Sequence, residues 1–285
     1  DINDLKKKIN KKTKAIYLVH HGGNPAELDK VNYLSKKFKV PIVEDCAHAL
    51  GAKINKKKIG SNSLIACFSF AQHKNISTLG EGGMLVTNNN DIATIASQLK
   101  DHGADKSDLQ RHNIKGSSLL PNFNVKGFNY RMTDIQGALG VSQMNKSDYI
   151  MSGRRKIANK YNEALSNIPQ LITPYVPEGY THGYQNYTCI FSNGEDISSI
   201  DKNLIDKLNH KRNIFMNKLE VMTIATRQGT HAIHTLGYYK DKYKFNDEDF
   251  LMSYAADKLS IALPLYANMS SEEFDYIISN IKNAL

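Results

Sequence analysis

The chain has 285 residues, of which 41% are hydrophobic and 23% are charged, a balance that excludes an intrinsically disordered protein. Its apolar runs all fall well short of the roughly 20 residues that span a bilayer. The formal net charge of +9 is compatible with a nucleic-acid partner, but the lysines are scattered and no arginine-rich stripe accompanies them. We therefore expect a cytoplasmic enzyme or binding protein with neither a nucleic-acid nor a membrane partner. A basic field would also attract a phosphorylated small molecule.

The cysteines and the start of the chain add two expectations. Cys46, Cys67 and Cys189 are odd in number and form no C-x-x-C pair, which favours reduced thiols. The chain opens at Asp1 in the middle of a structural pattern, with a lysine-rich helix and then a strand. This opening is typical of the continuation of a domain, so we expect that an upstream part of the first domain is absent.

The first half of the chain predicts strands alternating with helices. A helix over residues 2–11 is followed by a buried strand, Lys14–Val19, and a glycine-rich turn. Apolar residues at helical spacing then predict a helix over 28–38, and the run Pro41–Val43 predicts the next strand. Strand, helix and strand within thirty residues form a βαβ unit, which implies a parallel sheet.

The following residues predict a hairpin, two more strands and a long loop. The segment 49–60 contains I-N-K-K-K-I-G, typical of an exposed hairpin, and strands are predicted over Leu64–Phe70 and Gly83–Thr87. A helix over 91–100 leads into an irregular stretch, 103–130. Loops of this length in compact domains are usually functional or disordered, and its aromatic residues favour an ordered loop that forms part of a site.

A change of character after Pro169 predicts two domains. Thr133 is placed to cap a helix over 134–143, and a longer helix, 148–165, follows. We expect a large α/β domain over 1–147 and a linking helix with a smaller α+β domain over 148–285. In the second domain we predict strands at 187–191 and 219–224 and helices at 198–211, 247–258 and 270–284.

The candidate chemistry lies at the ends of two predicted strands. Glu44 and Asp45 follow one apolar run, and Lys74 lies in a polar turn behind another. Active residues of open α/β sheets gather at the carboxyl ends of strands, and desolvation there makes a lysine amine nucleophilic. Taken singly, Asp45 and Lys74 are more often surface ions, and His48 and His73 are more often structural. We find no metal-ligand spacing, phosphate-binding P-loop or nucleophile elbow.

Four ordered motifs make a family resemblance specific. They are E-D-C-A-H-A-L-G from Glu44, F-S-F-A-Q-H-K-N-I-S-T-L-G-E-G-G from Phe68, N-Y-R-M from Asn129 and L-P-L-Y from Leu263. Together they resemble the pyridoxal-phosphate-dependent sugar aminotransferases of the DegT/DnrJ/StrS family, and chance agreement of all four in order is remote. The resemblance covers the whole chain. It implies an aspartate-aminotransferase-like large domain of three layers around a mostly parallel sheet, and a smaller α+β domain.

The resemblance also implies a role for each motif residue. Lys74 corresponds to the lysine that forms the internal aldimine with pyridoxal 5'-phosphate, and Asp45 to the acid that keeps the pyridine nitrogen protonated. His48 resembles the histidine or glutamine beside the cofactor ring and its phenolic oxygen. Ser69 matches the serine that binds the cofactor phosphate. Asn129 matches an asparagine that reaches the phosphate of the neighbouring subunit's cofactor, which implies a homodimer.

Weaker expectations concern the substrate. Arg131 is expected to assist Asn129 or bind substrate, although a structural salt bridge is an equal alternative. His231 and His234 occupy the region where the family's second domain approaches the sugar, and a core or interface role is about as probable. The expected reaction moves an amino group from glutamate or glutamine to a nucleotide-linked keto sugar, in amino-sugar and surface polysaccharide biosynthesis. Lys74 would act there as covalent anchor and as general acid and base.

Two alternatives stay open from the sequence. Some family members carry histidine at the lysine position and are dehydratases; Lys74 is in frame here, which favours transamination. The upstream elements that the family uses for the cofactor phosphate are not found in the chain, and a helix N-terminus would be a natural phosphate site. The alternative function is therefore a truncated, catalytically weak relative that acts as a binding or assembly partner.

Overall fold

The computed structural model describes residues 1–61, 63–113 and 120–285. It divides the chain into two compact units, Asp1–Ser147 and Asp148–Leu285. Among the described residues, no helix is both long and apolar enough to cross a membrane.

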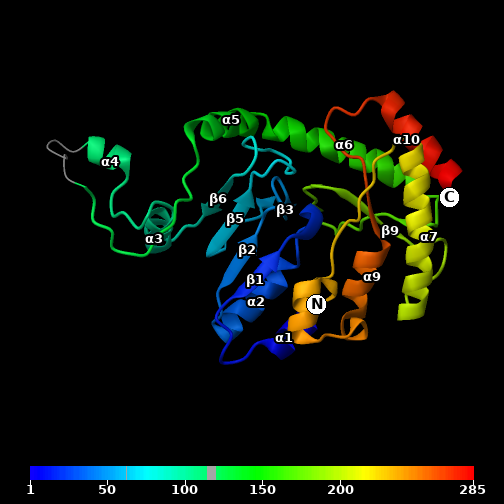
Figure 1. The fold of residues 1–285 in the computed structure, drawn as a ribbon, viewed down its shortest axis with the longest axis horizontal. Helices are drawn as coiled ribbons and strands as arrows, with labels where there is room; N and C mark the ends of the chain where they lie inside the picture. The colour runs from blue at the N-terminus through cyan, green and yellow to red at the C-terminus, as the bar shows by residue number, and fades with distance from the viewer. Residues whose placement is uncertain (62, 114–119) are drawn as a thin grey trace. The chain divides into compact units, whose positions relative to one another are not determined.

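Unit 1 is built on a four-stranded sheet in the order β1-β2-β5-β6 (Figure 1). Its strands are β1 (Ile16–Val19), β2 (Ile42–Asp45), β5 (Ile65–Ser69) and β6 (Gly83–Val86). The β1-β2 and β2-β5 pairs are parallel, and β6 joins β5 in the antiparallel direction. The predicted mostly parallel sheet is therefore confirmed, and the carboxyl ends of β1, β2 and β5 lie at one edge.

Two helices near the start of the chain build one apolar cluster of unit 1. They are α1 (Ile2–Lys8) and α2 (Leu28–Phe38), and the predicted helix 2–11 therefore ends early. Val31 on α2 packs with Ile16 of β1 and Ile42 of β2, which holds α2 on one face of the sheet. The other face of β1 is open in this unit, because Tyr17 is 64% exposed, so the predicted buried strand is buried on one face only.

The remaining elements of unit 1 follow the predicted order. The predicted hairpin is present as β3 (Lys53–Ile54) and β4 (Lys57–Lys58), and the 3-10 turn η1 covers His21–Gly23. The helices are α3 (Asn90–Lys100), α4 (Asp108–His112) and α5 (Asp134–Asn145). The short helix α4 lies within the stretch predicted to be irregular, of which residues 114–119 lie outside the described residues. The predicted cap is confirmed, since Thr133 and Gln136 form a reciprocal capping box on α5.

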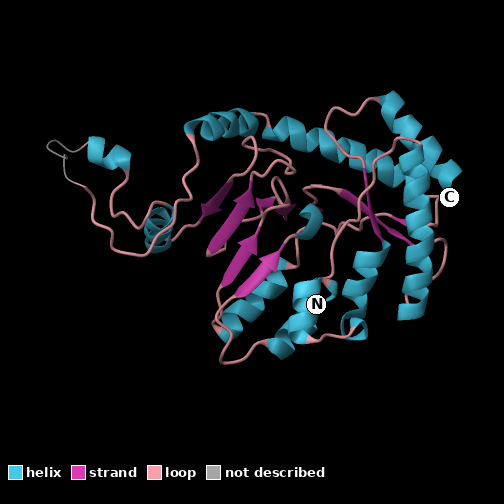
Figure 2. Cartoon of the chain, in the orientation of Figure 1, coloured by secondary structure: helices cyan, strands magenta, loops and turns pink. Residues whose placement is uncertain are grey.

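Unit 2 surrounds a three-stranded antiparallel sheet with helices (Figure 2). The sheet order is β10-β9-β7, formed by Ser260–Leu263, Tyr187–Phe191 and Leu171–Ile172. Side chains from α6 (Ser147–Leu165), α7 (Lys202–Val221) and α10 (Ser271–Ala284) bury a large apolar core with this sheet. The remaining elements are β8 (Tyr180–Thr181), η2 (Ile233–Thr235), α8 (Gly237–Tyr243), η3 (Asp247–Phe250) and α9 (Leu251–Leu259).

Two sequence predictions need correction. The strand predicted over 219–224 is wrong: the chain remains helical to Val221, because Leu219 completes a buried helical stripe with Leu208 and Phe215. The strand predicted over Pro41–Val43 continues to Asp45. Glu44 and Asp45 are therefore neighbours within β2, and the alternation of a strand sends their side chains to opposite faces.

Candidate active site

Asp45 is the last residue of β2, and both of its carboxylate oxygens accept a hydrogen bond from a neighbouring residue. The Tyr17 hydroxyl donates to Oδ2 at 3.1 Å, and the Ala47 amide donates to Oδ1 at 2.9 Å. Burial and the Asp45 charge raise the pKa of Tyr17, which keeps its hydroxyl a donor. The strand end and the parallel neighbour β1 thus fix a half-buried carboxylate in one orientation.

Lys74 lies in the turn after β5, where its amide donates to the Ala71 carbonyl at 2.9 Å. Its side chain is half-buried, and burial lowers the pKa of its amine, while the charges of Asp45 and Glu81 act in the opposite direction. A lowered pKa increases the fraction of neutral amine, the form that attacks a carbonyl carbon. Lys74 therefore lies within electrostatic range of the Asp45 carboxylate.

His48 is held between the first turn of the unit and Lys74. The Gly22 amide donates to His48 Nδ1 at 3.2 Å, and the ring lies edge-on to the His21 ring with centroids 5.8 Å apart. Burial, then the charges of Lys74 and His21, lower the pKa of His48 to about 4, and Asp45 opposes this shift. At neutral pH His48 is therefore uncharged, and since Nδ1 accepts a hydrogen bond, Nε2 carries its proton.

Ser69 ends β5 beside the predicted E-G-G turn. The Ala71 amide donates to Ser69 Oγ at 3.3 Å, and Ser69 pairs across the sheet with Gly83. A Cβ on Gly83 would lie 2.9 Å from the Phe68 carbonyl oxygen, so only glycine allows β5 and β6 to approach this closely. Ser69 thus lies at the carboxyl end of β5, the parallel neighbour of the strand that ends at Asp45.

Asn129 and Arg131 make their contacts elsewhere in unit 1. Both side chains are exposed, and the Asn129 backbone forms an isolated bridge with Asp101. Arg131 donates to Asp101 Oδ1 at 2.5 Å. The structure thus shows the salt bridge that was the alternative to a substrate role for Arg131, and it shows no bond from either residue to the strand-end site within the described residues.

His231 and His234 lie in unit 2 and differ from one another. His234 is only 5% exposed and stacks on Phe250 with ring centroids 5.0 Å apart, which is a packing role. His231 is exposed, and its Nδ1 lies 3.4 Å from the side-chain amide nitrogen, Nε2, of Gln228. The buried carboxylate of Asp257 holds this loop: it accepts from the Gln228 side chain, the Ala232 amide and the Thr235 hydroxyl.

Three residues near the site had not been assigned a role from the sequence. Tyr17 binds Asp45, and His20 and Glu44 form a fully buried pair with Nε2 and Oε2 2.7 Å apart. The available signal was position: His20 and Glu44 lie at the ends of neighbouring parallel strands, where side chains meet. A polar residue that faces the core at such a place needs a partner.

Comparison with known structures identifies the fold. Over the whole chain, the structure matches PseC of Helicobacter pylori, an aminotransferase of pseudoaminic acid biosynthesis, with a TM-score of 0.84 at 24% identity and 70% coverage of that chain. It also matches DesV of S. venezuelae, with a TM-score of 0.84 at 21% identity, covering 99% of this chain and 68% of that one. The predicted fold class is confirmed: this is the fold of the sugar aminotransferases.

Sequence comparison gives the family. A family model described as the DegT/DnrJ/EryC1/StrS aminotransferase family matches residues 1–282, and the chain belongs to this family of enzymes. The GDP-perosamine synthase of Escherichia coli O157:H7 is 30% identical over 283 residues, 98% of this chain and 68% of that protein. The spore coat polysaccharide biosynthesis protein SpsC of Bacillus subtilis is 29% identical over 280 residues, 98% of this chain and 68% of that protein.

Proposed function

We propose that this enzyme uses pyridoxal 5'-phosphate to move an amino group from glutamate or glutamine to the keto group of a nucleotide-linked sugar. The observation that carries the proposal is the half-buried Lys74, whose pKa is lowered by burial and which is coupled to the Asp45 carboxylate. Family membership supports the reaction class, and the named activities of the relatives support a nucleotide sugar as substrate. The product would serve amino-sugar and surface polysaccharide biosynthesis.

The residues of the strand-end site fit this cofactor. An amine with a lowered pKa suits an aldehyde, a fixed carboxylate suits a protonated pyridine nitrogen, and the Ser69 hydroxyl beside glycine-rich backbone suits a phosphate. His48 adds an uncharged N–H donor. When bound, pyridoxal phosphate supplies an aldehyde that condenses with amines and a ring that withdraws electrons from the adjacent carbon.

Each residue then has one task in the proposed reaction. Lys74 would anchor the cofactor and, once its amine is free, would carry a proton from the amino donor's carbon to the cofactor and, in the second half-reaction, a proton from the cofactor to the sugar carbon that receives the amino group. Asp45, oriented by Tyr17 and the Ala47 amide, holds the proton of the pyridine nitrogen in place. His48 remains neutral beside Lys74, so it does not add a second positive charge that would repel the ammonium form.

We further propose that the active enzyme is a homodimer acting in the cytoplasm. Asn129 is exposed, and its backbone is held by a bridge to Asp101. Its side chain is therefore free to reach the cofactor phosphate bound by a second chain. His231 is the better of the two histidine candidates for the sugar, because it is exposed while His234 is packed on Phe250. Three free thiols suit a reducing compartment.

Reductive labelling tests the central assignment. The purified chain is mixed with pyridoxal phosphate, reduced with borohydride and digested, and the labelled peptide is identified by mass spectrometry. We expect an absorbance band near the visible edge and a label on Lys74. Lys74→Ala should lose both, whereas Lys57→Ala, a variant of an exposed lysine in the β3-β4 hairpin, should keep both.

Two results would contradict the proposal. Retention of the band in Lys74→Ala would show that another amine holds the cofactor. Absence of the band in the unaltered chain would favour the alternative of a binding or assembly partner. If Lys74 is labelled as expected, keto-sugar nucleotides can be added one at a time to the form that carries the aminated cofactor. The nucleotide that restores the absorbance band identifies the sugar.

A further inference from the structure

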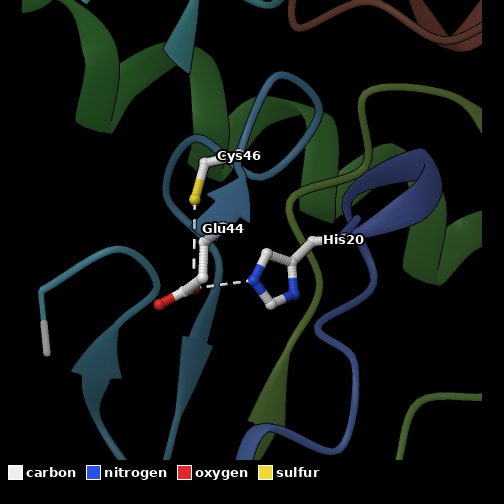
Figure 3. A group of neighbouring side chains, drawn as sticks. All are labelled: His20, Glu44 and Cys46. Carbon is white, nitrogen blue, oxygen red and sulfur yellow. Dashed lines mark hydrogen bonds and ion pairs between the residues drawn. The ribbon is translucent and has the colours of Figure 1, made fainter. Parts of the chain in front are cut away.

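His20, Glu44 and Cys46 form a buried polar cluster at the carboxyl end of β2 (Figure 3). His20 follows β1, Glu44 lies in β2, and both side chains are 0% exposed. His20 Nε2 and Glu44 Oε2 are 2.7 Å apart, and Cys46 Sγ lies 4.0 Å from the same oxygen. Burying polar side chains costs free energy unless they are hydrogen-bonded, so we first ask which hydrogen bonds these residues make.

The hydrogen bonds fix the tautomer of His20. The Ala26 amide donates to His20 Nδ1 at 3.0 Å, so this nitrogen carries no proton. His20 Nε2 is therefore the protonated nitrogen and donates to Glu44 Oε2. The Gly60 amide donates to the same oxygen at 3.3 Å.

The same bonds argue against a metal ion in this cluster. His20, Glu44 and Cys46 bring three possible ligand atoms within 4.8 Å of one another. A metal would need the Nε2 lone pair, which the proton occupies, and would compete with three donors for Glu44 Oε2. The other Glu44 oxygen, Oε1, has no partner among the described residues and points away from His20 in Figure 3. A hydrogen-bonded positioning pair accounts for the contacts better.

The pair is connected to His48 through one short turn. The His20 amide donates to the Asp45 carbonyl at 3.2 Å, which fixes the start of the turn 20–26 to β2 directly. The Ala26 amide donates to the His20 ring, which in turn binds Glu44, so the end of the turn is fixed to β2 through His20. Within this turn Gly22 adopts φ of 63° and directs its amide to His48 Nδ1. The orientation of this one amide determines which nitrogen of His48 carries the proton.

We propose that the His20–Glu44 pair is a positioning device that holds the turn 20–26 so that Gly22 donates to His48 and leaves the proton of His48 on Nε2. Resting on the proposed function, this N–H is a donor for an oxygen of the pyridoxal phosphate ring or of the substrate. His20 and Glu44 do not touch either group themselves. They act through the turn, and Glu44 fixes His20 in the tautomer that can accept from Ala26.

Nitrogen-15 NMR of the cofactor-free chain tests the proposal, because the two ring nitrogens of a fixed histidine tautomer give separate signals. In the unaltered chain we expect His48 in a single tautomer with the proton on Nε2. Glu44→Gln keeps the shape but removes the charge, and should raise hydrogen exchange of the Gly22 amide by about tenfold. Glu44→Leu removes the acceptor and should give His48 a mixture of tautomers.

Glu27→Gln is the matched control, since Glu27 is exposed, follows the same turn and pairs with the exposed Lys30. It should change neither the tautomer nor the exchange rate. A proton on His48 Nδ1 in the unaltered chain would overturn the proposal, even if Glu44→Leu does not fold. So would unchanged Gly22 exchange in Glu44→Gln. Because no cofactor is present, failure here is separate from failure of the Lys74 labelling.

Discussion

The two units of this enzyme are stabilised in different ways. In unit 2, helices and a sheet close a large apolar core that includes Tyr161, Tyr187 and Phe191. In unit 1, one apolar cluster gathers around Val31, and the unit also buries the His20–Glu44 pair next to the reactive residues. In unit 1, directional hydrogen bonds that fix side-chain orientation therefore lie next to the reactive residues, while the sheet of unit 2 is enclosed by apolar burial, which is not directional.

Truncation of a buried leucine in each unit should give the largest effects and show this contrast. Leu219→Ala removes a fully buried side chain from the core of unit 2 and should lower the free energy of unfolding by about 4 kcal/mol. Leu34→Ala should cost about 2 kcal/mol, because Leu34 borders a surface hollow with Ile2 and Tyr33 that can relax or admit water.

Denaturant unfolding followed by hydrogen exchange of peptides from each unit would measure both variants separately, since a chain with two units need not unfold in one step. Equal losses for the two leucines would contradict the difference in packing.

The two buried acids provide the next comparison. Both oxygens of Asp257 accept hydrogen bonds, from Gln228 on one side and from Ala232 and Thr235 on the other. An amide in Asp257→Asn would place a donor against a donor, at a cost of about 3 kcal/mol. Glu44→Gln can direct its amide nitrogen to the place of Oε1, which has no partner among the described residues, and should cost about 1 kcal/mol.

Thermal unfolding of both variants beside their parent would measure the difference. Asp257→Asn should also increase exchange at the Ala232 amide, because Asp257 holds that loop. A greater loss for Glu44→Gln than for Asp257→Asn would show that the charge of Glu44 matters more than its geometry.

Much of this arrangement follows from the sequence, for reasons that particular residues illustrate. The strand ends, the turn before Lys74 and the cap at Thr133 depend on local chemistry, so short patterns predict them. The stripe of α7 was missed at Leu219 because a short apolar run fits a strand as well as a helix. The Glu44–His20 pair and the Asp257 anchor join residues 22 or more positions apart, and no local pattern specifies such partners.

The titration of one buried histidine in each unit should change the folding stability by a smaller amount than the substitutions above. Burial lowers the pKa of His48 in unit 1 and of His182 in unit 2 to about 4, from an ordinary value of 6.5. The unfolded chain thus binds protons between pH 6.5 and 4 that the folded chain does not. Folding stability should fall as the pH is lowered through this window, by roughly 2 kcal/mol for each histidine.

The lowered pKa values of these two histidines have different causes, and one variant distinguishes between the causes. The Lys74 charge contributes to the shift of His48, whereas burial alone accounts for His182. Lys74→Met should therefore raise the pKa of His48 and leave that of His182 unchanged, as measured by NMR titration. A parallel shift of both histidines would point to a general change in the fold and not to the charge of Lys74.

Helix caps should give the smallest effects, again unequal between the units. Ser270 forms a capping box with Glu273 on α10, whose inner face buries Phe274 and Ile277. Thr133 forms the same box on α5, every residue of which is described and none buried. Each cap stabilises its own helix by about 1 kcal/mol.

Ser270→Ala should lower the unfolding free energy of unit 2 by that amount, because α10 is part of its core. Thr133→Ala should only increase exchange at the first amides of α5, including Gln136, because this helix can fray without opening a core. A loss of unit 1 stability equal to that of unit 2 would show that α5 contributes to folding despite its exposure.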